Sequence, residues 1–207
     1  MTQVLDFHDV SKKFGQTVVF DHFNLAISKG DFVFIKGKNG SGKSTLFNMA
    51  VGYEQPTSGT VSWFNNETDL AFRRRSSLLQ SRLLFDTNES FADYLRVVKS
   101  AKKYQLSPAV KELADAFDIE KYKRKPIYKL SSGNVRKWQI VANLSFEYEV
   151  IFHDEPDTNL DVESVKQYAG FCIKENNEGK TVILISHDQY LVNLFQKEVE
   201  NLKIICL

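Results

Sequence analysis

One segment near the start of the chain has the residue types and spacing that bind phosphate. Residues 37–44 read Gly-Lys-Asn-Gly-Ser-Gly-Lys-Ser, which matches the complete P-loop pattern. Glycines let this backbone wrap around phosphate with its N–H groups pointing inward, and a following helix adds partial positive charge. Lys43 is expected to contact the β- and γ-phosphates of ATP, and Ser44 to ligate Mg²⁺. The predicted ATP-binding residues of the loop are Gly37, Asn39, Gly40, Ser41, Gly42, Lys43, Ser44 and Thr45.

Two adjacent carboxylates, Asp154 and Glu155, directly follow the apolar run 150–152. Ligands of a doubly wound sheet bind beyond the carboxyl ends of its strands, so both side chains are expected to face the P-loop. Asp154 would hold the metal ion, directly or through water, and Glu155 would act as general base on the attacking water. The alternative is an ordinary polar loop after a core strand, and the P-loop favours the catalytic interpretation. His153 stands where an apolar residue is expected, and we interpret it as a half-buried histidine with satisfied hydrogen bonds.

The apolar pattern predicts the elements that must position these residues. Residues 4 to about 27 alternate apolar and polar side chains around a turn at Phe14 and Gly15, which predicts antiparallel strands. Ser107 and Pro108 form a helix start signal inside a helical stretch from about 88 to 118. Elsewhere, short apolar runs alternate with segments of helical spacing, and a mainly parallel sheet is expected. The predicted strands are 32–35, 150–152, 181–185 and 203–207, and the predicted helices are 44–50, 134–146, 162–176 and 190–199.

The predicted fold is therefore α/β, in a single domain over residues 1–207. It is a P-loop NTPase fold with a mainly parallel sheet flanked by helices. An antiparallel β subdomain stands at the N-terminus, and a helical subdomain is inserted at about 81–130.

Composition narrows the class of protein. Hydrophobic residues make up 43% and charged residues 26%, the balance of an ordinary globular domain. The net charge of +1 argues against bulk electrostatic binding of nucleic acid, and no such partner is expected. The two cysteines, Cys172 and Cys206, are too few for a disulfide framework, and we interpret them as small apolar residues. Since no apolar run is long enough to span a bilayer, we expect a cytoplasmic chain.

Several further segments, in chain order, make the sequence similar to the ATP-binding subunits of ABC transporters. Residues 130–134 read Leu-Ser-Ser-Gly-Asn and resemble the LSGGQ signature of that family. Gln80 resembles the Q-loop glutamine, residues 158–161 resemble the D-loop, and His187 resembles the switch histidine. Phe14 lies upstream of the P-loop, where the family carries an aromatic residue that stacks on adenine. The resemblance covers essentially the whole chain.

The resemblance implies roles for these residues. Gln80 would coordinate Mg²⁺ or the attacking water, and His187 would contact the γ-phosphate and help to orient that water. The signature would contact ATP held by a second subunit, from the start of the helix 134–146. With one P-loop and one signature, the chain needs a second copy or a paralogue, and we expect a homodimer. The residues expected at that interface are Ser131, Ser132, Gly133 and Asn134 of the signature and Asp161 of the D-loop.

Two departures from the signature pattern suggest altered turnover. Ser132 replaces the middle glycine, and Asn134 replaces the glutamine. Serine adds bulk beside a phosphate contact, whereas asparagine can still donate a side-chain hydrogen bond near the helix start. We therefore expect slower or differently tuned hydrolysis.

Two basic clusters could lie near a membrane. Residues 73–75 are Arg-Arg-Arg, and residues 121–125 are Lys-Tyr-Lys-Arg-Lys. The ordinary interpretation is a solvated face, and the alternative is proximity to anionic lipid headgroups. We expect the membrane subunit to dock on residues 83 to about 104, with Leu84, Phe85 and Phe91 more exposed than core residues.

The leading hypothesis is an ATP-binding subunit that hydrolyses ATP in a dimer and drives transport through a separate transmembrane permease. It would lie on the cytoplasmic face of the membrane, and export is the predicted direction. A non-transport ATPase that regulates a membrane or envelope complex is the main alternative. Family members that act as soluble ATPases on nucleic acid or ribosomes usually carry two ATPase units or long coiled-coil insertions, and this chain has room for neither. A pseudo-ATPase is disfavoured because Lys43, Asp154, Glu155 and His187 are all present.

Overall fold

A five-stranded parallel sheet forms the centre of the molecule. The computed structural model describes residues 2–65, 69–80, 88–98 and 106–207. Each neighbouring pair of strands in this sheet is parallel. The strands lie in the order β5 (Ser76–Leu79), β6 (Val150–Asp154), β7 (Thr181–Ile185), β3 (Phe32–Lys36) and β8 (Leu202–Cys206). Strands β6 and β7 are buried along their whole length, as expected where helices or a second sheet cover both faces.

A second, antiparallel sheet comes from the first part of the chain. Its strands are β1 (Gln3–Phe14), β2 (Thr17–Ser28) and β4 (Ser58–Trp63), in the order β2-β1-β4. Phe14 pairs with Thr17 across a two-residue turn, so the predicted hairpin is confirmed. Strand β4 was not among the expected strands.

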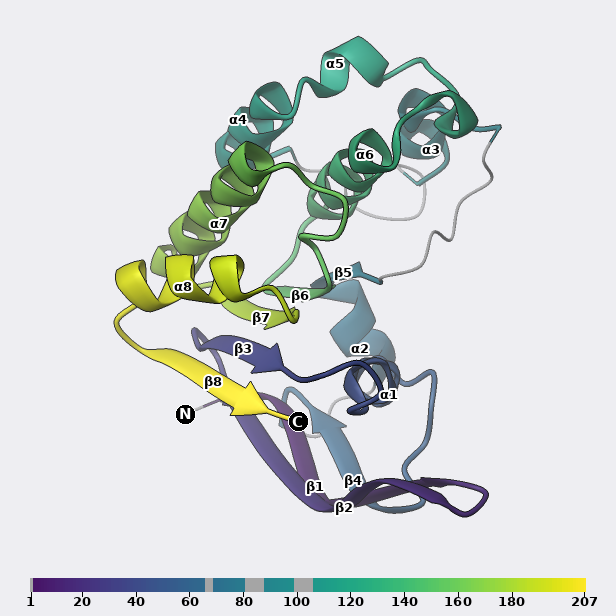
Figure 1. Ribbon diagram of the computed structural model, residues 1–207, viewed down its shortest axis with the longest axis vertical. Helices are drawn as coiled ribbons and strands as arrows, with labels where there is room; N and C mark the ends of the chain where they lie inside the picture. The colour runs from purple at the N-terminus through teal and green to yellow at the C-terminus, as the bar shows by residue number, and fades with distance from the viewer. Residues whose placement is uncertain (1, 66–68, 81–87, 99–105) are drawn as a thin grey trace.

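Helices cover both faces of the parallel sheet (Figure 1). Helices α1 (Lys43–Ala50) and α2 (Asp69–Arg74) share one face with the antiparallel sheet. Helices α6 (Ser132–Leu144), α7 (Val162–Asn177) and α8 (Gln189–Glu198) cover the other. Beyond α6 and α7 lie α3 (Phe91–Val98), α4 (Pro108–Ala116), α5 (Ile119–Tyr122) and the 3₁₀ helix η1 (Ile127–Lys129), at the end of the molecule opposite the antiparallel sheet.

Strand β3 shows how one short run joins two cores. Phe32 and Phe34 pack into the cluster built with α6, α7 and α8, whereas Val33 and Ile35 pack with the antiparallel sheet and α1. All four side chains are at most 2% exposed. Alternate residues of a strand point to opposite faces, so a continuous apolar run is what a doubly covered strand requires.

Hydroxyl side chains set the starts of two helices. Ser107 Oγ accepts a hydrogen bond from the Val110 N–H, as the predicted start signal requires. Ser131 Oγ accepts one from the Asn134 N–H at 3.3 Å. Because Ser131 is this cap, α6 begins at Ser132, two residues earlier than predicted.

Residues 83 to about 104 are expected to be the docking surface for a membrane subunit, and the exposure predicted there for Phe91 is wrong. Its side chain is 4% exposed and packs edge-on against Trp138 of α6, with ring centres 5.5 Å apart. Phe91 opens an amphipathic helix whose apolar face turns inward, so it is a core residue. Leu84 and Phe85 lie outside the described residues.

The basic clusters make ion pairs within the chain. Arg75 Nε lies 2.7 Å from Glu149 Oε1, and the Arg75 guanidinium lies over the Phe64 ring. Lys123 pairs with Glu120, while Arg74 is exposed. Arg75 therefore links α2 and β5 to the start of β6, which is a structural role.

The predicted α/β fold class is confirmed, including the parallel sheet, the N-terminal antiparallel sheet and the helices inserted before α6. The bounds of the helical subdomain and the single-domain assignment stay predictions. Within the described ranges, each helix is too short or too polar to cross a bilayer.

Candidate functional site

Four strand ends meet at one edge of the parallel sheet. The P-loop follows β3, Asp154 ends β6, His187 follows β7 after one residue, and Gln80 follows β5. The pairing register aligns these ends, since Asp154 lies opposite Ile185 and Ile185 lies opposite Ile35. Parallel strands thus deliver four distant parts of the chain to the same edge.

The P-loop backbone includes a glycine at a position where any side chain would be strained. Gly42 has φ +99° and directly precedes α1. A Cβ atom there would lie 2.8 Å from Val19 Cγ1 and 2.9 Å from Phe20 Cζ, both on β2. The antiparallel sheet therefore packs against the loop and holds it at the start of the helix.

The Lys43 ammonium is buried inside the loop. Its Nζ donates to the carbonyl oxygens of Gly37 at 2.8 Å and Lys38 at 3.0 Å, and the residue is 6% exposed. Ser41 Oγ is also buried and finds no partner among the described residues. A buried donor without a partner beside a cation and a helix N-terminus fits a phosphate group.

The donors near the loop also fit a magnesium ion. Among the described residues, no cluster of three histidine, cysteine or acidic side chains could hold a metal alone. Mg²⁺ commonly takes one or two protein oxygens and completes its coordination with substrate phosphates and water. The Ser44 hydroxyl, in the first turn of α1, and the Asp154 carboxylate, at the end of β6, are oxygens of that kind.

A cavity of about 280 Å³ joins the P-loop to the catalytic candidate. Its described lining consists of Phe14, Val19, Asn39, Gly40, Gly42, Lys43, Ser44, Thr45 and Glu155. Phe14 is 47% exposed, as a residue that stacks on a planar ligand must be. The Lys12 ammonium lies 4.7 Å from the ring centre and is held by Glu54 and by the Gln55 carbonyl. Lys12 was not predicted, and its attachment to two loop residues fixes the cation beneath Phe14.

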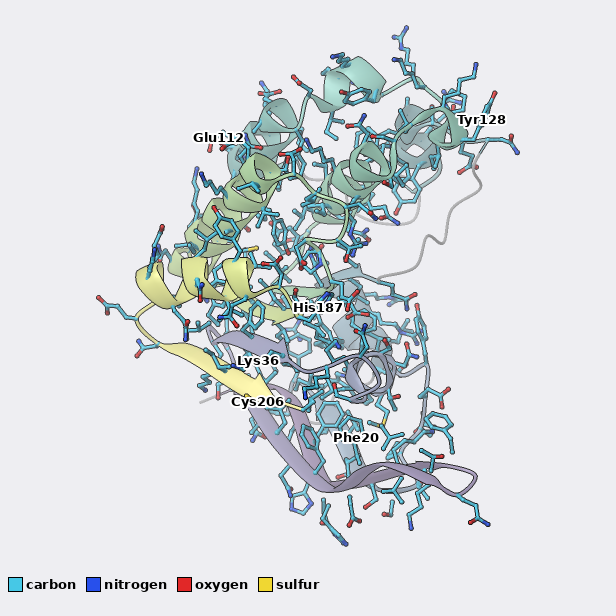
Figure 2. All side chains as sticks on the ribbon, viewed as in Figure 1. Phe20, Lys36, Glu112, Tyr128, His187 and Cys206 are labelled. Atoms are coloured by element: carbon cyan, nitrogen blue, oxygen red, sulfur yellow. The ribbon has the colours of Figure 1, made fainter. Side chains whose placement is uncertain are left out.

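Glu155 contacts His187, which lines a second cavity. The Nδ1 atom of His187 lies 3.3 Å from Glu155 Oε1. His187 lines a cavity of about 460 Å³ together with Lys36, Lys38, Cys206 and other residues at the ends of β3 and β8. Figure 2 shows Lys36, His187 and Cys206 gathered at these strand ends. Gln80 and Asp154 are not among the described residues that line either cavity.

The signature contacts the D-loop of its own chain. A Cβ atom on Gly133 would lie 2.6 Å from the Asn159 carbonyl oxygen, so this glycine permits a close backbone approach. Asp161 caps α7 by accepting from the Ser164 N–H at 2.8 Å, and Lys137 of α6 lies 3.1 Å from its other oxygen. The Ser164 hydrogen bonds lower the pKa of Asp161 to about 2. None of the described cavity-lining residues around the P-loop belongs to the signature.

Known proteins resemble this chain in sequence and in fold. A family model described as ABC transporter matches residues 20–158, which include the P-loop, Gln80, the signature and the acid pair. The chain belongs to the ABC transporter family. The zinc import ATP-binding protein ZnuC of Rickettsia bellii is 30% identical over 190 residues, covering 91% of this chain and 78% of the relative. The lipoprotein-releasing system ATP-binding protein LolD of Aquifex aeolicus is 29% identical, covering 97% and 94%. A solved ATP-binding subunit of an ABC transporter has the same fold, with 22% identity, a TM-score of 0.81 and 98% and 85% coverage.

As a member of the ABC family, the chain is an ATP-binding subunit and an ATPase. The roles of individual residues stay predictions that the geometry supports to different degrees. Phe14, the P-loop and Glu155 share one cavity, and His187 contacts Glu155. The signature residues stand at the capped start of α6, apart from their own P-loop lining, as expected if they contact another subunit.

His153 differs from its predicted environment. It is 0% exposed rather than half-buried, with Nε2 3.0 Å from Ser77 Oγ and Nδ1 2.8 Å from the Tyr168 hydroxyl. Burial lowers its pKa to about 3, so the imidazole is neutral at physiological pH. The predicted satisfaction of its hydrogen bonds is confirmed, and the ring joins β5, β6 and α7.

A buried arginine in α6 is the main residue that the sequence analysis missed. Arg136 is 4% exposed and donates to main-chain oxygens at the ends of both β5 and β6. Its only sequence signal is a charged residue among the apolar positions of the helix that follows the signature. Solvated faces of helices also carry arginine, so the pattern alone did not distinguish a buried one.

Substituting Ser132 tests the altered ABC signature. Ser132 is exposed at the first position of α6, so Ser132→Gly should leave the fold intact. We expect ATP hydrolysis to rise about threefold, because removing bulk at a phosphate contact lowers the barrier by less than about 1 kcal/mol. Steady-state phosphate release measures this rate. Ser132→Ala is the matched control, since it removes the hydroxyl and keeps Cβ. An unchanged or lower rate in Ser132→Gly would argue against a steric effect.

Proposed function

We propose that the chain hydrolyses ATP at the edge where β3, β6 and β7 end, and that hydrolysis drives a process in a separate membrane subunit. The main support is that Glu155 lines the same cavity as the P-loop, with His187 3.3 Å from its carboxylate. The P-loop and the candidate base therefore border one space, and His187 contacts that base from the side.

The reaction requires an in-line attack of water on the γ-phosphorus. Glu155 accepts a proton from the attacking water. At the same time the water oxygen bonds to the γ-phosphorus, and the bond between that phosphorus and the β–γ bridging oxygen breaks. Lys43 and the N–H groups of the P-loop stabilise negative charge on the phosphates. His187, with Nδ1 3.3 Å from Glu155 Oε1, would orient that carboxylate and contact the γ-phosphate.

Mg²⁺ fits this site as the partner of the phosphates. Ser44 and Asp154 would hold it, with Gln80 as the predicted third contact. When bound, the ion neutralises charge on the β- and γ-phosphate oxygens. The protein makes the other contributions to catalysis, because it orients the triphosphate relative to the attacking water.

A dimer would complete the site. The capped start of α6 presents the signature away from the P-loop lining of its own chain. In a two-fold dimer, each signature can face the P-loop of the partner, so both sites are completed by the same contact. A homodimer is the simplest assembly for a chain with one copy of each motif.

The membrane partner and the direction of transport are the finer parts of the proposal. A separate transmembrane permease would convert dimer closure into movement, with the chain bound at the cytoplasmic face. Export stays the predicted direction. The relatives point to more than one task, since ZnuC is named for zinc import and LolD for lipoprotein release.

One observation favours a second candidate function. The relative LolD has almost the same extent as this chain, with 97% and 94% coverage. An ATPase that acts mechanically on a membrane or envelope complex, without transporting a solute, is therefore the alternative.

Capture of the membrane partner tests both candidates. Membranes are solubilised gently, and tagged Glu155→Gln is recovered with ATP and Mg²⁺, which should trap the assembled state. We expect a stoichiometric multi-spanning protein that raises the ATPase rate of the native chain when the two are reconstituted in vesicles. Tagged Lys43→Ala serves as the control that should not assemble. Recovery of ribosomes or a soluble protein alone would overturn the proposal, and the fold of a membrane partner would distinguish a permease from an envelope complex.

A further inference from the structure

Arg136 connects the signature helix to two strand ends at the ATP site. Its Nη1 donates to the Gln80 carbonyl oxygen at 2.9 Å, and its Nη2 donates to the Asp154 carbonyl oxygen at 2.8 Å. Nη2 also donates to the carbonyl oxygen of Glu155. One guanidinium therefore holds the main chain of the last residue of β6, of the catalytic candidate after it, and of the first residue after β5.

The Glu155 backbone needs such support. Its φ is +49°, in the left-handed region that a residue with a side chain occupies at a cost of about 1–2 kcal/mol. Surrounding structure must impose this conformation. The Glu155 N–H donates to the Ile185 carbonyl of β7 at 2.7 Å, and its carbonyl accepts from Arg136. The two bonds fix both sides of the residue and thereby set the direction of its carboxylate.

Stability alone does not account for a buried guanidinium here. Burial lowers the pKa of Arg136, and the charges of Asp157, Asp154 and Glu155 oppose that shift. Its Nε finds no partner among the described residues. Buried ion clusters can often be replaced by apolar side chains without loss of stability, so this arrangement is consistent with a functional requirement.

The alternatives to arginine at this position could not make the same contacts. Lysine ends in a compact ammonium, whereas the planar guanidinium presents donors in a fixed fork that reaches several carbonyl groups. Gln139, one turn along α6, accepts from Nη1 at 3.3 Å and helps to orient the plane.

We propose that Arg136 is the positioning residue that sets the Glu155 carboxylate and the start of the Q-loop relative to the signature helix. The proposal rests on the proposed function, in which Glu155 is the general base. Because α6 begins with the signature, the same contact makes the base of one ATP site move with the surface that completes the other.

The test combines Arg136→Met with Glu155→Gln. We expect Arg136→Met to bind ATP with a Kd within about threefold of the native value, because Lys43 and the P-loop are untouched. Its kcat should fall about a hundredfold, the order expected when a catalytic group is displaced by about 1 Å. Arg74→Met is the matched control, since it removes an exposed arginine and should leave both values unchanged. Circular dichroism and thermal unfolding identify a variant that does not fold, in which case Arg136→Lys replaces it.

The double variant separates positioning from a general structural effect. If Arg136 acts through Glu155, Arg136→Met should lower the residual single-turnover rate of Glu155→Gln by less than about twofold. The positioning role would be overturned if the rate losses of the two single variants multiply in the double variant. It would also be overturned if Arg136→Met lowers ATP affinity as much as kcat. Either result would leave the base assignment intact. Normal turnover in Glu155→Gln alone would instead overturn the base assignment, and with it the role of Arg136.

Discussion

Glu155→Gln is expected to bind ATP normally and to hydrolyse it about 10²–10⁴-fold more slowly than the native chain. Glutamine keeps the size and shape of the side chain and cannot accept a proton from water. The His187 neighbour and the P-loop cavity should be preserved, because the left-handed backbone at residue 155 is held by main-chain contacts. Phosphate release measures turnover, and equilibrium binding of a fluorescent ATP analogue measures affinity.

The same variant should accumulate as a dimer with ATP and Mg²⁺, since slow hydrolysis delays reopening. Gel filtration with and without nucleotide detects this state. Glu198→Gln, at the exposed end of α8, is the control for loss of one negative charge. Near-native hydrolysis in Glu155→Gln would mean that another group serves as the base.

Lys43→Ala is expected to abolish measurable ATP binding and, with it, hydrolysis. The buried Lys43 ammonium donates to two P-loop carbonyl oxygens and lies where phosphate oxygens would compete for it. Hydrogen bonds to charged groups contribute about 1.5–3 kcal/mol each. Losing two such bonds from Lys43 to the phosphate oxygens of ATP therefore weakens ATP binding by about two to four orders of magnitude. Isothermal titration calorimetry with ATP and Mg²⁺ measures the loss.

Lys38→Ala is the matched control for that experiment. Its side chain is exposed in the same loop, and its carbonyl, which accepts from Lys43, is kept. We expect a change in ATP affinity of less than about fivefold for this control. Retained ATP hydrolysis in Lys43→Ala would overturn the placement of the site, provided that its unfolding transition matches the native chain.

The parts of the site that could be predicted are those encoded in contiguous residues. Residues 37–44 carry the loop, the lysine and the helix start together, and the acid pair directly follows its strand. An apolar run followed by polar residues locates a strand end, and parallel strands gather such ends at one edge. The approximate positions of β3, β6 and β7 followed from the same reasoning.

The parts that could not be predicted depend on contacts between distant residues. Strand β5 begins with two buried serines, of which Ser77 contacts His153, and an apolar pattern does not detect such a strand. A phenylalanine at position 91 would suit either a surface that binds a partner or the contact with Trp138, so its residue type alone does not distinguish the two. Arg136 is buried because three carbonyl groups from two strand ends surround it, and no local pattern encodes that meeting.

The place of β3 in the sheet has a consequence for synthesis on the ribosome. Phe32 pairs with Val182 on one side and with Leu202 on the other, so both neighbours of β3 are made long after it. Until those residues emerge, a nascent chain exposes an apolar run that has no strand beside it, which favours aggregation or chaperone binding. The P-loop is translated early, but β3, the strand that precedes it, gains both of its neighbouring strands only when β8 has left the exit tunnel. Nucleotide is therefore expected to assist folding only after β7 and β8 have emerged beside β3, and not while the first half of the chain is exposed alone.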